Sequence, residues 1–213
     1  MLFDFPATLQ QDAVLDWYEL CSEGIAERRL FALNLLKTGQ SPPDYLVDAL
    51  NGATELEVNE YFEDCQAELD LSTAFTLIAA AEARIRLDAQ KRIDLVGAAK
   101  AANNNLLTNR LGLLFSQANR PWSVSFYDDG ILEAWKSYVA TLAISQQDRD
   151  RLLGGIGGMK SALPLRHWVA HGRYWEPTRE LISSAPLQVA NTIHRLYSCL
   201  RDIAVRGNAL AFA

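Results

Sequence analysis

A long stretch of strong helix formers most constrains the fold of this chain. Residues 55–93 are rich in Ala, Leu, Glu and Arg, most of which lose little side-chain freedom in a helix. The stretch predicts either one long helix or two helices separated at Asp70-Leu71-Ser72. On a helical wheel at about 100° per residue, its apolar seam also contains an acidic residue, Glu82. The apolar members of the seam are Leu71, Phe75, Ile78, Ile85 and Ala89.

Amphipathic helices are predicted on both sides of this stretch. A capping box at Thr8 and Gln11 opens a first helix that ends near Gly39, and Pro186 opens the last helix. Helices are also expected at residues 44–50, 131–145 and 159–171, with a further candidate at 106–114 and an extended segment at 124–127. Such helices must bury their apolar faces against one another, which predicts an all-α fold, an antiparallel helical bundle.

The chain has one glycine-rich element, Gly154-Gly155-Ile156-Gly157-Gly158. It does not match a P-loop, because Met159 occupies the position of the glycine that must precede the lysine. It does not match the dinucleotide-binding fingerprint either, since Lys160 occupies the position of the third glycine. We therefore expect a flexible hinge in front of the helix at 159–171.

Composition and charge exclude several classes of protein. Apolar residues make up 49% of the 213 residues, which is enough for a globular core and argues against a wholly disordered chain. Neither a membrane span nor a leader is apparent, and three widely spaced cysteines predict reduced thiols in a cytoplasmic protein. The net charge of −6 argues against coating of nucleic acid by bulk attraction.

The charge is unevenly distributed along the chain. Residues 1–153 hold 13 Lys and Arg against 23 Asp and Glu, whereas residues 154–213 hold 7 against 3. An anionic ligand is therefore expected to favour the C-terminal part.

The densest polar chemistry lies in the segment 165–173, which reads LRHWVAHGR. Arg166 and His171 converge if the helix ends at His171, which Gly172 favours as a C-cap residue. An imidazole can exchange a proton with a 2′-OH or a leaving oxygen, and a guanidinium stabilises phosphate charge, so the pair suits metal-independent cleavage of RNA. Alternatively, His167 and His171 share a helix face and could ligate zinc, although Trp168 stands where a zinc protease has glutamate.

The run Leu165-Arg166-His167-Trp168-Val169-Ala170-His171-Gly172 closely resembles the R-x(4–6)-H signature of HEPN-domain proteins. In that family a polar residue usually follows the arginine, and Ala-His-Gly is a frequent ending. The resemblance predicts an N-terminal helical extension at residues 1–53 and a HEPN-like bundle with a four-helix core at residues 54–213. It implies an endoribonuclease that cuts single-stranded RNA as a homodimer, with two motifs facing one cleft.

The resemblance also implies roles for individual residues. Arg166 would bind or polarise the phosphate, His171 would act as general acid or base, and His167 would be an accessory polar group. Glu82 would face the cleft and pair with Arg166. Further substrate contacts are expected from Lys160, Arg173 and Trp168. No metal or cofactor is needed, and many such proteins resemble toxins or antiviral defence factors restrained by an inhibitor or antitoxin.

Other interpretations compete with this one. Glu82 has a second possible partner in Arg86, four residues away, and His171 could simply cap its helix. The chain could be a non-catalytic nucleotide- or protein-binding module of the same fold, or a metal-dependent hydrolase that uses His167 and His171. A solvent-exposed motif would favour the nuclease over the non-catalytic binding module. Loss of activity on chelation would favour the metal-dependent hydrolase.

Overall fold

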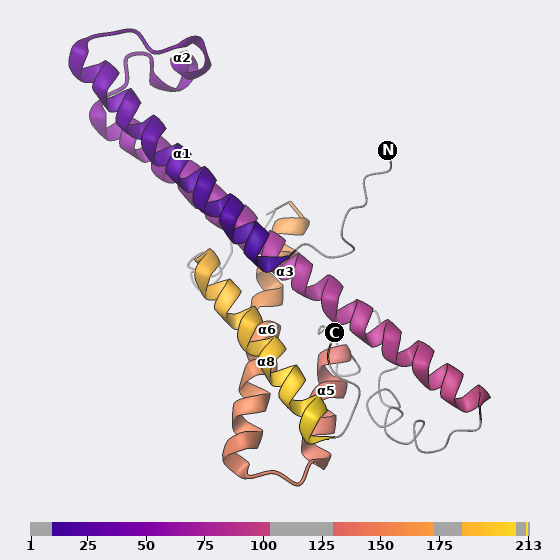
Figure 1. Cartoon of the computed structure of the whole chain (residues 1–213). Coiled ribbons are helices and arrows are strands. Elements are labelled where there is room, and N and C mark those ends of the chain that lie inside the picture. The colour runs from indigo at the N-terminus through magenta and orange to yellow at the C-terminus, as the bar shows by residue number, and fades with distance from the viewer. Residues whose placement is uncertain (1–9, 103–129, 173–184, 208–211, 213) are drawn as a thin grey trace.

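The computed structural model describes residues 10–102, 130–172, 185–207 and 212 (Figure 1). Its described part contains six helices and no strand, so the all-α fold class is confirmed. The helices are α1 (Gln11–Thr38), α2 (Asp44–Leu50), α3 (Glu55–Ala101), α5 (Ile131–Thr141), α6 (Gln146–Ala170) and α8 (Pro186–Arg206). The predicted segments at 106–114 and 124–127 lie outside the described residues, as does Thr8 of the predicted capping box.

α1 and the N-terminal half of α3 form a long antiparallel hairpin, seen as the diagonal pair in Figure 1. Tyr18 donates a hydrogen bond to Asp70 at 2.9 Å near one end, and Arg29 donates to Asn59 at 2.8 Å nearer the other. α1 ends as predicted, with Gly39 in the left-handed region at φ 65°. A small apolar cluster at the tip joins the two helices to α2 through Ala32, Leu46, Leu50, Val58 and Phe62.

The stretch of helix formers is one helix of 47 residues. The polar side chains at the suspected break bond back into the helix instead of interrupting it. Ser72 donates to the carbonyl of Leu69 at 3.1 Å, and Thr76 donates to the carbonyl of Ser72 at 2.8 Å. The helix therefore continues past the hairpin and into the main core.

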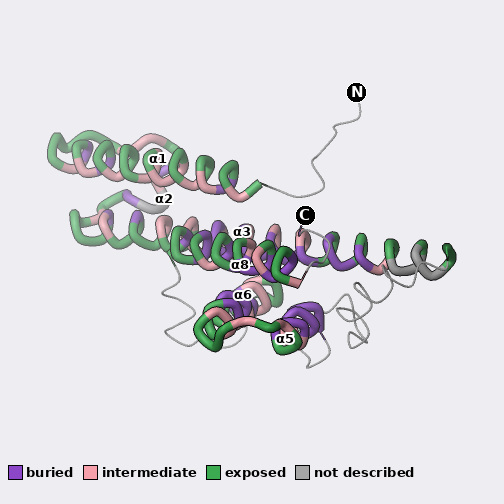
Figure 2. Tube along the Cα trace, turned by 60° about the horizontal axis from the view of Figure 1, so that its bottom comes forward, coloured by how far each residue is buried: buried purple, intermediate pink, exposed green. Residues whose placement is uncertain are grey.

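The main core is built mostly from α3, α5, α6 and α8, which Figure 2 shows as a concentration of buried positions. The apolar stripe of α8 is buried in this core and consists of Val189, Ile193, Leu196, Leu200 and Ile203. The first turn of α1 reaches this core, since Val14 belongs to it and Gln11 donates to the carbonyl of Ala190 at 2.8 Å. α1 thus contacts both the tip cluster and the main core.

The glycine run is not a hinge, and this prediction is wrong. α6 begins behind Ser145, whose hydroxyl accepts from the Asp148 N–H, and continues through all four glycines to Ala170. The glycines let α8 approach closely: a Cβ on Gly155 would lie 2.4 Å from Cys199 Sγ. The helix predicted at 131–145 is shorter in the structure, where α5 ends at Thr141 and a short connection leads into α6.

Within its described residues, the chain contains no helix that combines the length and apolar character required to span a membrane.

Candidate functional site

The Arg-His motif occupies the C-terminal end of α6. The helix ends at Ala170, His171 is its cap residue, and Gly172 adopts φ 81°, a left-handed conformation that suits glycine. The N–H of His171 donates to the carbonyl of His167 at 3.1 Å. The helix end expected from Gly172 is therefore present, and His171 is exposed to solvent there.

Glu82 of α3 lies opposite Arg166 and forms the predicted ion pair. Its Oε2 is 3.1 Å from Arg166 Nε, and its Oε1 contacts Arg86 Nη2. Both proposed partners of Glu82 are therefore engaged at once, one on each carboxylate oxygen. The Glu82 side chain is 10% exposed, whereas that of Arg166 remains 35% exposed. The two guanidiniums offset the free-energy cost of removing the Glu82 carboxylate from water. The ion pair with Glu82 also holds the Arg166 side chain in a defined orientation.

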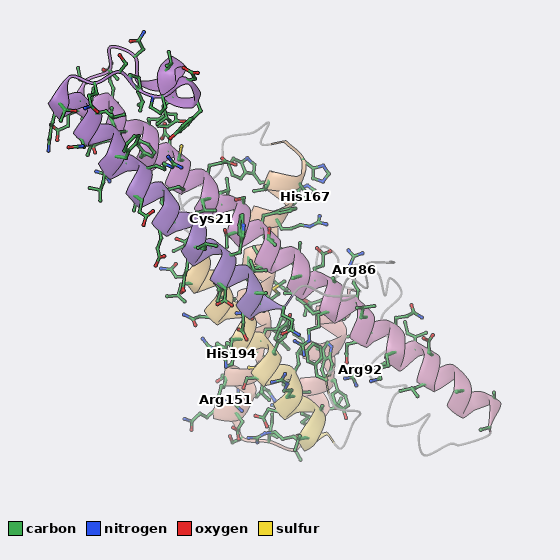
Figure 3. All side chains as sticks on the ribbon, turned by 45° about the horizontal axis from the view of Figure 1, so that its top comes forward. Cys21, Arg86, Arg92, Arg151, His167 and His194 are labelled. Carbon is green, nitrogen blue, oxygen red and sulfur yellow. The ribbon has the colours of Figure 1, made fainter. Side chains whose placement is uncertain are left out.

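His167 and His171 lie side by side, with ring centroids 4.1 Å apart and planes inclined by 53°. His167 is half-buried, one turn before His171, and Figure 3 shows it near the end of α6. Among the described residues no third His, Cys, Asp or Glu joins the two histidines in a group of metal-ligand type.

The remaining predicted substrate contacts fall in different places. Lys160 lies about three helical turns before His171 on α6 and forms an ion pair with Glu133 of α5. Trp168 is 7% exposed and belongs to the main core, so it does not present a ring face for stacking on a base. Arg173 lies outside the described residues.

Glu133 is the residue of this region that the sequence analysis did not identify. It also pairs with Lys136 at 3.1 Å, within its own helix. Burial opposes ionisation of Glu133, yet the two ammonium groups hold the pKa of its carboxyl below the ordinary value. The spacing to Lys136 is a local signal, but no local pattern relates Glu133 to Lys160, which is 27 residues away.

No protein-family model, curated protein or solved structure matches this chain.

Proposed function

We propose that this chain is a metal-independent endoribonuclease of HEPN type that cleaves single-stranded RNA. Arg166 binds and polarises the scissile phosphate, and His171 transfers a proton to or from the reacting oxygens. The 2′-OH loses its proton, and its oxygen attacks the phosphorus to form a 2′,3′-cyclic phosphate. The bond from phosphorus to the 5′ oxygen of the next nucleotide breaks, and that oxygen leaves with a proton. His167 is the accessory polar group beside the reacting centre.

One observation carries the proposal: at the C-terminal end of α6 the chain presents an exposed imidazole, His171, and a partly exposed guanidinium, Arg166, that is ion-paired with Glu82. The Arg166 Nε contact to Glu82 leaves over a third of the arginine side chain exposed toward solvent. His171 is exposed one residue beyond the helix, where its side chain can reach a substrate. A buried, closed motif would have favoured a purely structural role.

The proposal extends to assembly and biological role. A single motif supplies one Arg166 and one His171, and a homodimer with its two motifs facing each other would supply two protonic groups to one phosphate. The proposed enzyme acts in the cytoplasm as a toxin or antiviral defence factor, and a partner protein that covers the motif would restrain it. The proposed reaction uses no cofactor.

The test is cleavage of a labelled single-stranded RNA in excess EDTA by wild type, His171→Ala and Arg166→Ala. We expect cleavage with 2′,3′-cyclic ends by the wild type and a loss of at least about a hundredfold in both variants. Arg151→Ala is the matched control, since Arg151 lies on the same helix and pairs with Asp202 away from the motif. Circular dichroism and size-exclusion chromatography show whether fold and oligomeric state persist.

Other results contradict the nuclease. Activity that disappears with EDTA supports the metal-dependent hydrolase, and an inactive wild type supports a binding module. Loss of the fold in His171→Ala, or equal loss of activity in Arg151→Ala, removes the evidence for a specific catalytic role.

A further inference from the structure

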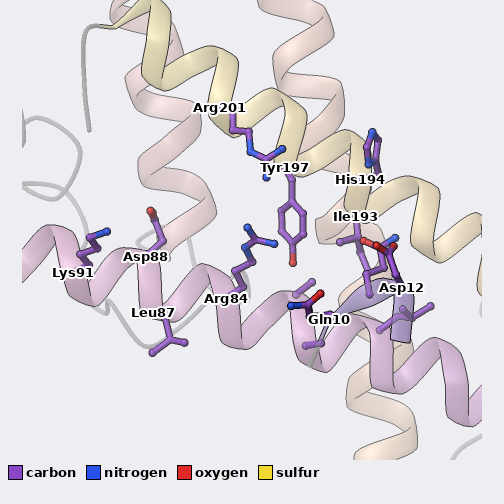
Figure 4. A pocket seen from close by; sticks show the side chains of 14 residues that line it. Gln10, Asp12, Arg84, Leu87, Asp88, Lys91, Ile193, His194, Tyr197 and Arg201 are labelled. Atoms are coloured by element: carbon purple, nitrogen blue, oxygen red, sulfur yellow. The ribbon is translucent and has the colours of Figure 1, made fainter. Parts of the chain in front are cut away.

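A second polar site lies between α3 and α8. It is a pocket of about 640 Å³ that the N-terminal turn of α1 closes at one end (Figure 4). Ligand sites commonly have volumes of about 300–1,000 Å³. On α3 the lining runs from Leu77 to Lys91, which at about 1.5 Å per residue corresponds to a groove of about 21 Å.

The groove is lined with cations. Arg84 and Lys91 project from α3 and Arg201 from α8 (Figure 4), and the last two are exposed. Asp88 also lines the groove, but Arg92 binds both of its carboxylate oxygens, at 2.7 and 3.0 Å. The charge of Asp88 is therefore compensated, and Asp12 at the α1 end is the other acidic residue among the described residues that line the groove.

Tyr197 organises the centre of the groove. The guanidinium of Arg84 lies 4.6 Å from the centre of the Tyr197 ring, a distance typical of a cation–π contact. Burial raises the pKa of the Tyr197 hydroxyl, and the nearby Arg84 and Arg201 oppose that rise. The contact holds Arg84 over the groove.

The wall of the groove is partly apolar. Leu87 is 50% exposed in the middle of the α3 lining, and Ala80 and Ala81 leave space near the α1 end. A strand of nucleic acid offers the matching chemistry, since its phosphates contact cations while its bases pack on apolar surface. A groove of about 21 Å is long enough for several nucleotides of a stacked strand, which advances about 3.4 Å per nucleotide in a duplex.

We infer that this groove between α3 and α8 holds a segment of single-stranded RNA, with its phosphates on Arg84, Lys91 and Arg201. This inference rests on the proposed function, for which the groove supplies a substrate-binding surface apart from the motif. The chain as a whole carries a charge of −6, so attraction for RNA is confined to local surfaces of this kind.

The test measures the affinity of a labelled single-stranded RNA across a range of salt concentrations. Binding is measured in the His171→Ala background, in which the proposed reaction does not consume the RNA. Lys91→Ala combined with Arg201→Ala should weaken binding at least about tenfold at low salt. The slope of log affinity against log salt should fall by about 1.4, the value for two lost phosphate contacts on a single strand.

Lys37→Ala combined with Arg195→Ala is the matched control. It removes the same residue types from exposed positions on α1 and α8 that do not line the groove. We expect less than about a twofold effect from this control. Equal losses in the two double variants would show bulk attraction and overturn the inference, as would unchanged binding when Lys91 and Arg201 are removed.

The results also separate this inference from the proposed function. Cleavage by the wild type, with RNA binding that does not depend on Lys91 and Arg201, overturns the groove alone. Groove-dependent binding without any cleavage supports the groove and overturns the nuclease. A chain that neither binds nor cleaves RNA overturns both.

Discussion

Glu82 on α3 and Arg166 on α6 are joined by an ion pair, with Oε2 and Nε 3.1 Å apart. The second oxygen of the same carboxylate contacts Arg86. The pair fixes the last two turns of α6 against α3, and with them the start of the Arg-His motif. In the proposed enzyme Glu82 therefore acts through Arg166, as a positioning residue.

Replacing Glu82 with Gln should lower kcat with little effect on KM. The amide keeps the size of the side chain but loses the charge that orients Arg166, and misplacement of a catalytic group by about 1 Å costs up to about a hundredfold. We expect a decrease in kcat of about 10- to 100-fold, measured by steady-state cleavage of single-stranded RNA. Glu82→Asp keeps the charge and should recover part of the loss.

Arg86→Gln is the control for this prediction. It removes the other partner of Glu82 and leaves the pair with Arg166 in place, so kcat should fall by less than about threefold. If both variants lost the same activity, or if only KM changed, Glu82 would not act by orienting Arg166.

The sequence predicted that Glu82 would be paired, because helical periodicity places its carboxylate on a buried face. Glu82 lies on the same helical face as Ile78 and Ile85, both fully buried in the structure, and a buried charge needs a partner. Periodicity does not determine which partner, since Arg86 is close along the chain and Arg166 is close only after α6 packs on α3. The groove between α3 and α8 depends entirely on such packing, and no motif indicated it.

A second buried ion pair, between Asp88 and Arg92, should contribute strongly to stability. Both side chains are at most 1% exposed, and the Arg92 guanidinium lies 4.7 Å from the centre of the Trp135 ring. Asp88→Asn removes the carboxylate that binds the buried Arg92 guanidinium, and breaking a buried ion pair by removing one partner costs about 3–5 kcal/mol. Urea unfolding followed by circular dichroism measures the change.

Asp94→Asn is the matched control on the same helix. Asp94 is exposed and accepts a hydrogen bond from Gln90 at 2.8 Å, so its replacement should change the free energy of unfolding by less than about 0.5 kcal/mol. Similar values for the two variants would contradict the role assigned to the buried pair.

The glycines of α6 show where local sequence rules mislead. Glycine in a helix interior costs about 1 kcal/mol relative to alanine, so a run of four indicated a hinge. The structure instead packs α8 against Gly155 and Gly158, where a Cβ would lie 2.4 Å from Cys199 Sγ and 3.2 Å from Thr192 Cγ2, respectively. The close approach of α8 depends on tertiary packing, which the sequence of α6 alone does not predict.

This packing predicts opposite effects for two alanine substitutions. Gly155→Ala forces the Cys199 side chain or α8 to move, and overpacking of this kind costs about 1–3 kcal/mol. At Gly157 a Cβ meets nothing within 4 Å, so Gly157→Ala should stabilise the chain by about 0.5–1 kcal/mol. Thermal unfolding of both variants checks this, and stabilisation by both would mean that α8 does not pack closely on Gly155.

The ion pairs of Glu133 should make the stability of the chain depend on pH. Lys160 and Lys136 hold the pKa of Glu133 below the ordinary 4.5, so its ionised form is favoured in the folded state. A carboxyl with a lowered pKa stabilises the fold above its unfolded pKa, and this contribution is lost as the pH falls through the folded value. Near pH 7, Glu133→Gln should therefore cost about 1.5–3 kcal/mol of unfolding free energy.

Urea unfolding at a series of pH values measures the difference in unfolding free energy between Glu133→Gln and the wild type. This difference should persist down to the ordinary carboxyl pKa and shrink below it. A difference that stays constant through acid would show that Glu133 contributes by packing and not by charge.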